Sequence, residues 1–195
     1  MYIPKHFEVT EQEEIFSFIQ ANGFGQLIST LKNRPYVTHL PLLLNTSKDK
    51  LLGHIAKQNP QHTELEGQEV LVTLQGPHNY ISPSWYDSPG VPTWNYQAVH
   101  IYGKCRIFSD TNQLAELVNT LTSNYEANFE GPWQTNYPPA MLNAIIGLEI
   151  TIEETQCKYK LGQNRSPQDR KQVASELNKQ HSFSLASAIK QIDDQ

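Results

Sequence analysis

The longest strand that the sequence predicts spans residues 93–108, and its alternation constrains the fold more than any other feature. One side of the segment carries Val99, Ile101, Cys105 and Ile107, and the other carries His100, Tyr102, Lys104 and Arg106. Successive side chains of a strand point to opposite faces, so this pattern predicts one buried and one polar face. A sheet with one solvated face is typical of antiparallel proteins.

The remaining pattern predicts about six or seven strands in all. The other strands are expected at 26–30, 36–44, 51–56, 69–74 and 147–161, with a polar turn at 45–50. Helices are expected after the capping box Thr10–Glu13, after Asn59–Pro60, after Asp110 or Thr111, and at 139–146. Because strands and helices do not alternate strictly, the pattern disfavours a doubly wound parallel sheet. The predicted fold class is mainly β, a small antiparallel barrel with peripheral helices.

The sequence changes character after Gly162, and we place a domain boundary there. Residues 1–162 form the predicted barrel domain, and residues 163–195 form a helical C-terminal appendage. Ser166 is the expected cap of one helix, and a last helix is expected to end at Ile192. Because Val173 and Leu177 are the only strong apolar pair of the first helix, the appendage is expected to be polar and partly packed.

Charge and composition narrow the classes of protein to consider. The 195-residue chain carries a net charge of −5, which argues against DNA binding through a broad basic face but leaves room for a small basic patch. Cys105 and Cys157 are interpreted as free thiols in a reducing compartment. The histidines show no metal-ligand spacing, and no apolar run approaches the roughly 20 residues of a membrane span. We therefore expect a soluble, cytoplasmic protein without a metal site.

The segment from Gly76 to Tyr96 interleaves aromatic rings, prolines and small polar side chains. Proline has no backbone N–H to donate to a neighbouring strand, so this segment is not expected to be a plain core strand. Its composition suits a wall that holds a flat ligand with a polar edge. Aromatic rings can stack on the ligand, and hydroxyls and amides can orient it by hydrogen bonds to its edge. An aromatic-rich loop over an ordinary core has the same composition, and composition alone slightly favours the loop.

A second segment of interest is 53–61, in which a predicted strand ends at Lys57 and runs into a helix start at Asn59. Free backbone N–H groups and a cation meet there, as a phosphate group requires. A capped helix beside a solvated lysine is the commoner meaning of such a segment. His39 and His54, taken singly, are more commonly partly buried histidines than ligand contacts.

A third segment, 158–165, places Lys158, Lys160 and Arg165 at the end of the last predicted strand. A solvated strand end explains these cations more simply than a phosphate contact does. No nucleophile elbow surrounds Ser84 or Ser88, and no glycine-rich phosphate loop is present. Any chemistry is therefore expected to come from a bound cofactor.

Six motifs follow one another along the chain. They are Met-Tyr-Ile-Pro-x-x-Phe at the start, Thr-His-Leu-Pro at 38–41, Gly-His-Ile-Ala-x-x-Asn-Pro-Gln at 53–61, Gly-Pro-x-x-Tyr-Ile-Ser-Pro-x-Trp-Tyr at 76–86, Val-Pro-Thr-Trp-Asn-Tyr at 91–96 and Lys-x-Lys-Leu-x-Gln-Asn-Arg at 158–165. In this order they resemble the PaiB-type FMN-binding negative transcriptional regulators, from residue 1 to about residue 177. The resemblance implies an FMN-binding split barrel, a homodimer with two flavin sites at its interface, and a role as a transcriptional repressor.

The resemblance also implies a set of cofactor-binding residues. The FMN phosphate is expected near Arg34, Thr38, Lys57, Asn59 and Gln61, and His39 and His54 are included in the cofactor site. The flavin ring is expected along Thr93, Trp94, Asn95 and Tyr96, with Tyr80, Ser82 and Trp85 closing the pocket. Gln163, Asn164 and Arg165 are expected to approach the cofactor from the last strand, across the dimer interface. The family's usual serine in the last motif is Gly162 here, so one hydroxyl contact is absent.

Two functions fit these expectations. The first is a regulator in which the flavin senses redox state or a ligand and the partner is a DNA operator. The second is a small FMN-dependent oxidoreductase acting on a small molecule, for which no catalytic residue is assigned. The few basic residues of 165–190 stand beside acidic ones, which argues against a DNA-reading helix pair. The choice between the two functions, haem in place of FMN, and a cofactor-free interaction module all remain open.

Overall fold

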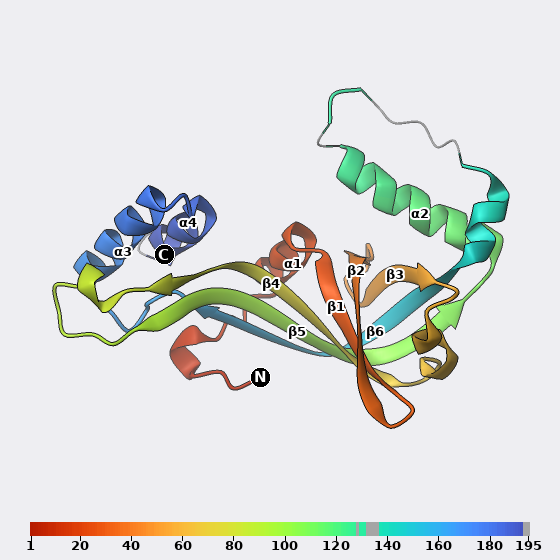
Figure 1. Cartoon of the computed structure of the whole chain (residues 1–195), viewed down its shortest axis with the longest axis horizontal. Coiled ribbons are helices and arrows are strands. Elements are labelled where there is room, and N and C mark those ends of the chain that lie inside the picture. Colours follow the sequence, from red (N-terminus) through yellow and green to blue (C-terminus); the bar gives the residue numbers. More distant parts are fainter. Residues whose placement is uncertain (128, 132–136, 193–195) are drawn as a thin grey trace. The chain divides into compact units, whose positions relative to one another are not determined.

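The computed structural model describes residues 1–127, 129–131 and 137–192 (Figure 1). The last three residues of the predicted appendage lie outside the described residues. The strands are β1 (Phe24–Leu31), β2 (Arg34–Leu44), β3 (Lys50–Ala56), β4 (Glu69–Ile81), β5 (Thr93–Phe108) and β6 (Ile145–Lys160). They close into an antiparallel barrel in the order β1-β2-β3-β6-β5-β4, which confirms the predicted mainly β class.

Helices accompany the barrel. The α-helices are α1 (Gln12–Ala21), α2 (Thr111–Glu126), α3 (Pro167–Lys179) and α4 (Phe183–Gln191), and the short 3₁₀ helices are η1 (Lys5–Phe7), η2 (Pro60–Glu64), η3 (Pro83–Trp85) and η4 (Pro139–Ala144). None of the described helices combines the length and the apolarity that crossing a bilayer requires.

The chain divides into two compact units. Residues 19–74 and 100–155 form one, which we call the barrel unit, and residues 1–18, 75–99 and 156–195 form the other, which we call the terminal unit. The domain boundary expected after Gly162 stays a prediction.

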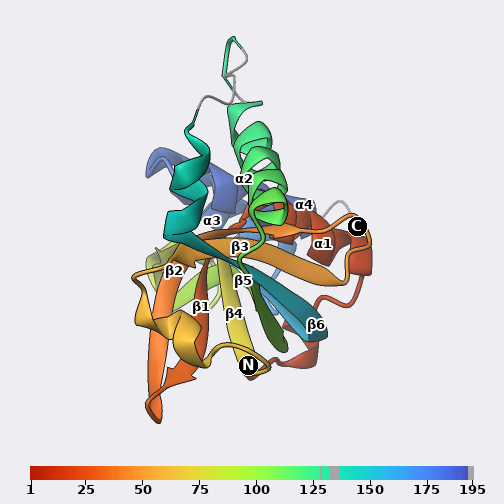
Figure 2. The same ribbon diagram turned by 90° about the vertical axis from the view of Figure 1, so that its right-hand side faces the viewer.

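The barrel unit is built on two consecutive antiparallel pairings, in which Leu27 is opposite Thr38 and Leu42 is opposite Gly53. Alternation along each strand buries one set of side chains, which are Leu27, Leu40, Leu42, Leu51, Ile55, Val72, Ile101, Leu148 and Ile150. Helix α2 lies over β3 in both views (Figures 1 and 2). It begins where the Asp110 side chain accepts from the backbone N–H groups of Asn112 and Gln113.

The terminal unit contains the C-terminal helices α3 and α4, which pack side by side (Figure 1). Ser166 caps α3 by accepting from the backbone N–H of Asp169 at 3.1 Å, as expected. The buried residues of the pair are Val173, Ala174 and Leu177 from α3 and Leu185, Ala186 and Ile189 from α4. The expectation of a partly packed tail was wrong, because α4 supplies the apolar partner that α3 lacks by itself.

The segment 76–81 also differs from its prediction, because it continues β4 instead of forming a loop. Strand β1 pairs with residues 71–73 of β4, so Pro77 stands outside that pairing and its missing N–H removes no bond there. Gly76 is needed at its position, since a Cβ there would lie 2.7 Å from the Phe18 ring. A proline in a strand is thus accommodated where one neighbour has ended.

Candidate functional site

The predicted phosphate segment of the barrel unit contains a closed hydrogen-bond cluster. Asn59 caps η2, with its Oδ1 accepting from the Gln61 backbone N–H at 3.0 Å. Its Nδ2 donates to Thr38 Oγ1 at 2.8 Å, and Thr38 Oγ1 donates to Gln61 Oε1 at 2.6 Å. The cluster therefore satisfies its own polar groups and fixes the turn that follows β3.

Gln61 is the centre of this cluster and is 1% exposed. Its Nε2 donates to Ser29 Oγ at 2.8 Å, in addition to the bond that its Oε1 accepts. We predict that Gln61→Met, a change of similar volume, lowers the free energy of unfolding by about 1–3 kcal/mol, because the buried Ser29 hydroxyl and the half-buried Thr38 hydroxyl lose their partner. Chemical denaturation measures this, with Gln58→Met at an exposed position as the matched control. A loss no larger than the control's would show that the cluster does not hold the turn.

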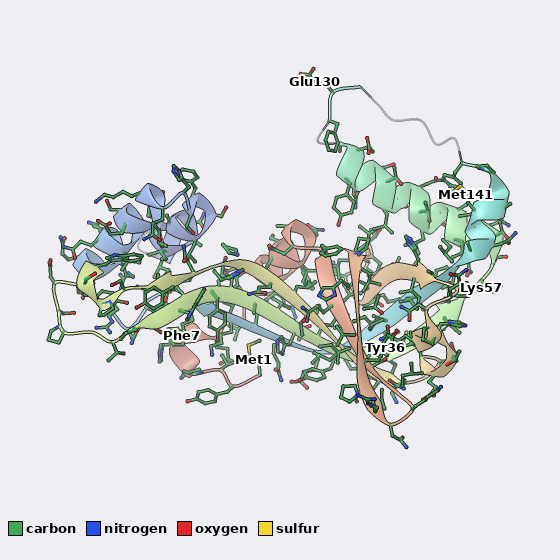
Figure 3. The ribbon with its side chains drawn as sticks, in the orientation of Figure 1. Met1, Phe7, Tyr36, Lys57, Glu130 and Met141 are labelled. Atoms are coloured by element: carbon green, nitrogen blue, oxygen red, sulfur yellow. The ribbon has the colours of Figure 1, made fainter. Side chains whose placement is uncertain are left out.

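The two cations of the predicted phosphate site take no part in the hydrogen bonds of this cluster. Lys57 follows directly after β3 (Figure 3), its side chain is exposed, and its backbone N–H donates to Ala144 O at 2.7 Å. Arg34 is exposed at the start of β2. Neither side chain forms a hydrogen bond or an ion pair in the part of the chain that the structure describes. Lys57 and Arg34 therefore keep their hydrogen-bonding capacity for a ligand.

The two predicted histidines differ from each other. His39 is exposed and stacks on Phe24, with 6.4 Å between ring centroids. His54 is half-buried on β3, and its Nδ1 has no hydrogen-bond partner among the described residues. Burial lowers the pKa of His54, so the neutral ring is favoured there.

The terminal unit places three predicted flavin contacts together. Tyr80 lies edge-on to Trp94 with 6.2 Å between centroids, and Tyr96 follows two residues after Trp94 on the same side of β5. We call Tyr80, Trp94 and Tyr96 the aromatic face. Trp94 is 54% exposed and Tyr80 is 42% exposed, so two large rings remain open to a flat ligand.

Lys160 ties the aromatic face to Thr93. Its Nζ donates to Thr93 Oγ1 and, at 2.9 Å, to the carbonyl of Trp94. Asn95, by contrast, is turned away by strand alternation and is 3% exposed. It faces Gly162, where a Cβ would lie 3.8 Å from Asn95 Nδ2. Gly162 has a φ of +89°, which a glycine adopts without the strain that a serine would meet.

The remaining predicted contacts are mostly used inside the terminal unit. Ser82 caps η3 and contacts Ser84 Oγ at 2.7 Å, with Trp85 half-buried at the end of that helix. Gln163 accepts from the Leu161 N–H and donates to Tyr159 O, so its amide closes the turn after β6. Asn164 is exposed.

A set of contacts fastens the loop after η3 to the start of α3. Asp169 is 1% exposed and accepts from the Ser88 hydroxyl at 2.6 Å and the Asp87 N–H at 2.9 Å. Arg165 lies over the Tyr86 ring at 4.3 Å and donates to Pro89 O at 3.0 Å. We call these contacts the loop latch. It joins the segment that leads into the aromatic face to the C-terminal helices.

Asp169 makes the loop latch sensitive to acid. The Ser88 hydroxyl, followed by the backbone N–H groups of Asp87 and Ser88, holds the pKa of Asp169 below its usual range. The contribution of the Asp169 carboxylate to stability is fully present above its pKa in the unfolded chain, about 3.9. It is lost as pH falls through the lower pKa that Asp169 has in the folded protein. We predict that Asp169→Asn reduces the loss of thermal stability that the parent protein shows as pH falls from about 5 to about 2. Thermal unfolding at a series of pH values measures this loss. The exposed Glu153→Gln should leave this loss unchanged, and equal losses for both variants would contradict the prediction.

Sequence reasoning does not assign three of these residues to the site. It explains Lys158 and Lys160 as a solvated strand end, although their spacing of two puts both on one face of a strand. It explains Asp169 only as an acid in the first turn of a helix, and nothing local reveals its distant partners. The described residues contain no group of three or more His, Cys, Asp or Glu arranged for a metal. Burial raises the pKa of both Cys105 and Cys157 to about 12, so neither is an activated thiol.

Comparison with known proteins decides the family. The profile of the family described as "Putative FMN-binding domain" matches residues 1–154. The chain belongs to this FMN-binding family. Protease synthase and sporulation protein PAI 2 of Bacillus subtilis is 41% identical over 202 residues, covering 100% of this chain and 97% of that protein. The resemblance to the PaiB type is thereby confirmed, and the family assignment makes FMN or a related flavin the cofactor of this chain.

Solved structures show the same fold at low sequence identity. The flavocytochrome of Azotobacter vinelandii has a TM-score of 0.66 at 17% identity, covering 81% of this chain and 72% of its own. The FAD and heme binding protein of Mycobacterium smegmatis has a TM-score of 0.65 at 14% identity, covering 80% and 74%. These likenesses confirm the split-barrel fold of the FMN-binding family member described here.

Proposed function

We propose that this chain is a homodimeric, PaiB-like negative transcriptional regulator in which a bound flavin acts as a redox or ligand sensor. The observation that carries the proposal is the 41% identity to PAI 2, which spans the whole chain. The family profile ends at residue 154, so the relative extends the likeness through α3 and α4.

Each unit, taken by itself, has residues that suit a flavin nucleotide. In the terminal unit, Trp94 and Tyr80 offer exposed rings for a flavin ring system. In the barrel unit, Arg34 and Lys57 have side-chain donors free for a phosphate. FMN, when bound, supplies one- and two-electron redox chemistry. Trp94 and Tyr80 would stack on the flavin ring system. Thr38, Asn59 and Gln61 would act indirectly, by fixing the turn that carries Lys57.

The loop latch supports the sensor role. The segment 82–92 connects β4 and β5, which carry Tyr80 and Trp94, and Asp169 and Arg165 hold this segment to α3. A change at the aromatic face that moves this segment would alter the contacts of α3. The aromatic face and α3 would then be the two linked sites that regulation requires.

The alternative function is a small FMN-dependent oxidoreductase. The open aromatic face favours it, because a second small molecule has access to a flavin stacked there. His78 is a candidate proton donor, since its ring centroid lies 6.5 Å from that of Trp94. The absence of an assigned catalytic residue does not weigh against it, because a flavin carries its own chemistry.

One paired experiment separates the two functions. The FMN-loaded protein is tested for binding to duplexes from the region upstream of its own gene and to an unrelated duplex, in oxidised and reduced states and over a salt series. A regulator should prefer one duplex by at least about a hundredfold, with an affinity that falls steeply with salt. Equal binding to all duplexes, together with steady oxidation of NADH or NADPH, would replace the regulator by the oxidoreductase.

A further inference from the structure

Two lysines of β6 border the aromatic face. Lys158 and Lys160 are two residues apart on one strand, so their side chains share a face. Lys158 Nζ lies 5.4 Å from the centroid of the Tyr96 ring. Lys160 Nζ donates to the carbonyl of Trp94 at 2.9 Å. Lys158 therefore lies between the rings of Tyr2 and Tyr96, and Lys160 lies beside the backbone of the exposed Trp94.

Neither charge has a counter-charge in the part of the chain that the structure describes. Lys158 is only 8% exposed, and its Nζ donates to Tyr2 O at 3.0 Å. No described carboxylate forms an ion pair with either ammonium, not even that of Glu8, which pairs with Lys158 by a backbone bridge. A buried ammonium without an anionic partner is costly, so the position of Lys158 is not that of a solvated strand end.

The two ammonium groups also have hydrogen-bonding capacity to spare. Each carries three donors. Tyr2 O occupies one donor of Lys158, and Thr93 Oγ1 and Trp94 O occupy two of Lys160. Burial, and next the like charge of Lys158, lower the pKa of Lys160. A ligand with negative charge and several acceptor oxygens would offset the repulsion between the two ammonium groups. It would also accept hydrogen bonds from their unused donors.

We propose that Lys158 and Lys160 form an oxyanion-binding site at the edge of the aromatic face, which takes a phosphate or carboxylate group. The proposal rests on the proposed function in that a flavin lies on this face, but the site itself is made by the two lysines. One source of the oxyanion is the phosphate of FMN, in place of its expected position near Arg34 and Lys57. The other is an anionic group on a second small molecule that lies against the flavin ring.

The test titrates the full-length protein with FMN, riboflavin and inorganic phosphate, using flavin fluorescence and calorimetry. The variants are Lys158→Met and Lys160→Met, which each remove one charge, and Lys160→Arg, which keeps it. Lys104→Met, at an exposed position of β5, is the control with the same change in net charge. Loss of a charge-assisted contact is expected to weaken oxyanion binding about tenfold to hundredfold in Lys160→Met. Lys160→Arg and Lys104→Met should stay within about threefold of the parent protein.

Two outcomes support the site and identify the source. If FMN binding weakens in Lys160→Met and riboflavin binding does not, the oxyanion is the FMN phosphate. If both flavins bind as before, and inorganic phosphate binds the FMN-loaded parent but not the FMN-loaded variant, the oxyanion belongs to a second ligand.

Other outcomes overturn the site. Unchanged affinities for FMN and phosphate in both Lys160→Met and Lys158→Met would do so, as would equal losses for FMN and riboflavin, which would place the charge against the ring. A failure of the proposed function looks different, because a protein that binds no flavin can still bind phosphate through these lysines. Thermal unfolding of each variant confirms that the altered titrations come from folded protein.

Discussion

Truncating Leu177 to alanine is expected to lower the free energy of unfolding by about 2–5 kcal/mol, the usual range for a buried leucine. Leu177 is 0% exposed on α3, and the other buried residues of the α3–α4 pair include Ala174 and Ala186. The effect measures directly whether the C-terminal helices are a packed part of the fold. Chemical denaturation followed by circular dichroism gives the value.

The control for this measurement is Lys171→Ala on the exposed side of the same helix, which is expected to change stability by less than about 0.5 kcal/mol. If Leu177→Ala lowers the free energy of unfolding no more than the control does, α3 and α4 are only loosely packed. That result would also remove the loop latch as a route from the aromatic face to the helices, since that route requires a firmly held α3.

The second large effect is expected on flavin binding. Trp94→Ala should weaken FMN binding roughly tenfold to hundredfold, because a stacking ring on an aromatic platform contributes that much to affinity. Trp94 is 54% exposed, so its removal should leave the fold intact. Fluorescence titration with FMN measures the change.

Two variants control for the loss of an aromatic side chain. Trp94→Phe keeps a ring on the aromatic face and should retain affinity within about threefold. Phe183→Ala removes a ring that is 59% exposed on α4, outside the aromatic face, and should change nothing. Equal affinities for the parent protein and Trp94→Ala would show that the flavin lies elsewhere.

Much of the fold could be predicted because it depends on local signals. The alternation over residues 93–108 matches the bounds of β5, and Asn59 caps η2 as its position before Pro60 indicates. The missed features depend on partners distant in sequence. The extension of β4 through Pro77 depends on where β1 ends, and the packing of α3 depends on the apolar stripe of α4.

In the candidate site, too, the features set by neighbouring residues could be predicted and those set by distant partners could not. The composition of the segment from Gly76 to Tyr96 suits a flat ligand but slightly favours a loop, and the structure sets Tyr80 against Trp94. The burial of Lys158 and the loop contacts of Asp169 involve residues 156 and more than 80 positions apart, respectively. Strand alternation could have placed both lysines on one face, but only the structure shows that no described carboxylate pairs with them.

The most direct test of the account is the visible absorption spectrum of the purified protein, with mass identification of what denaturation releases. We expect a flavin spectrum and released FMN, with affinity for added FMN reduced in Trp94→Ala. A colourless protein that also fails to bind added FMN would contradict the central claim, as would a haem spectrum without flavin. The aromatic face would then have to hold a different ligand or a protein partner.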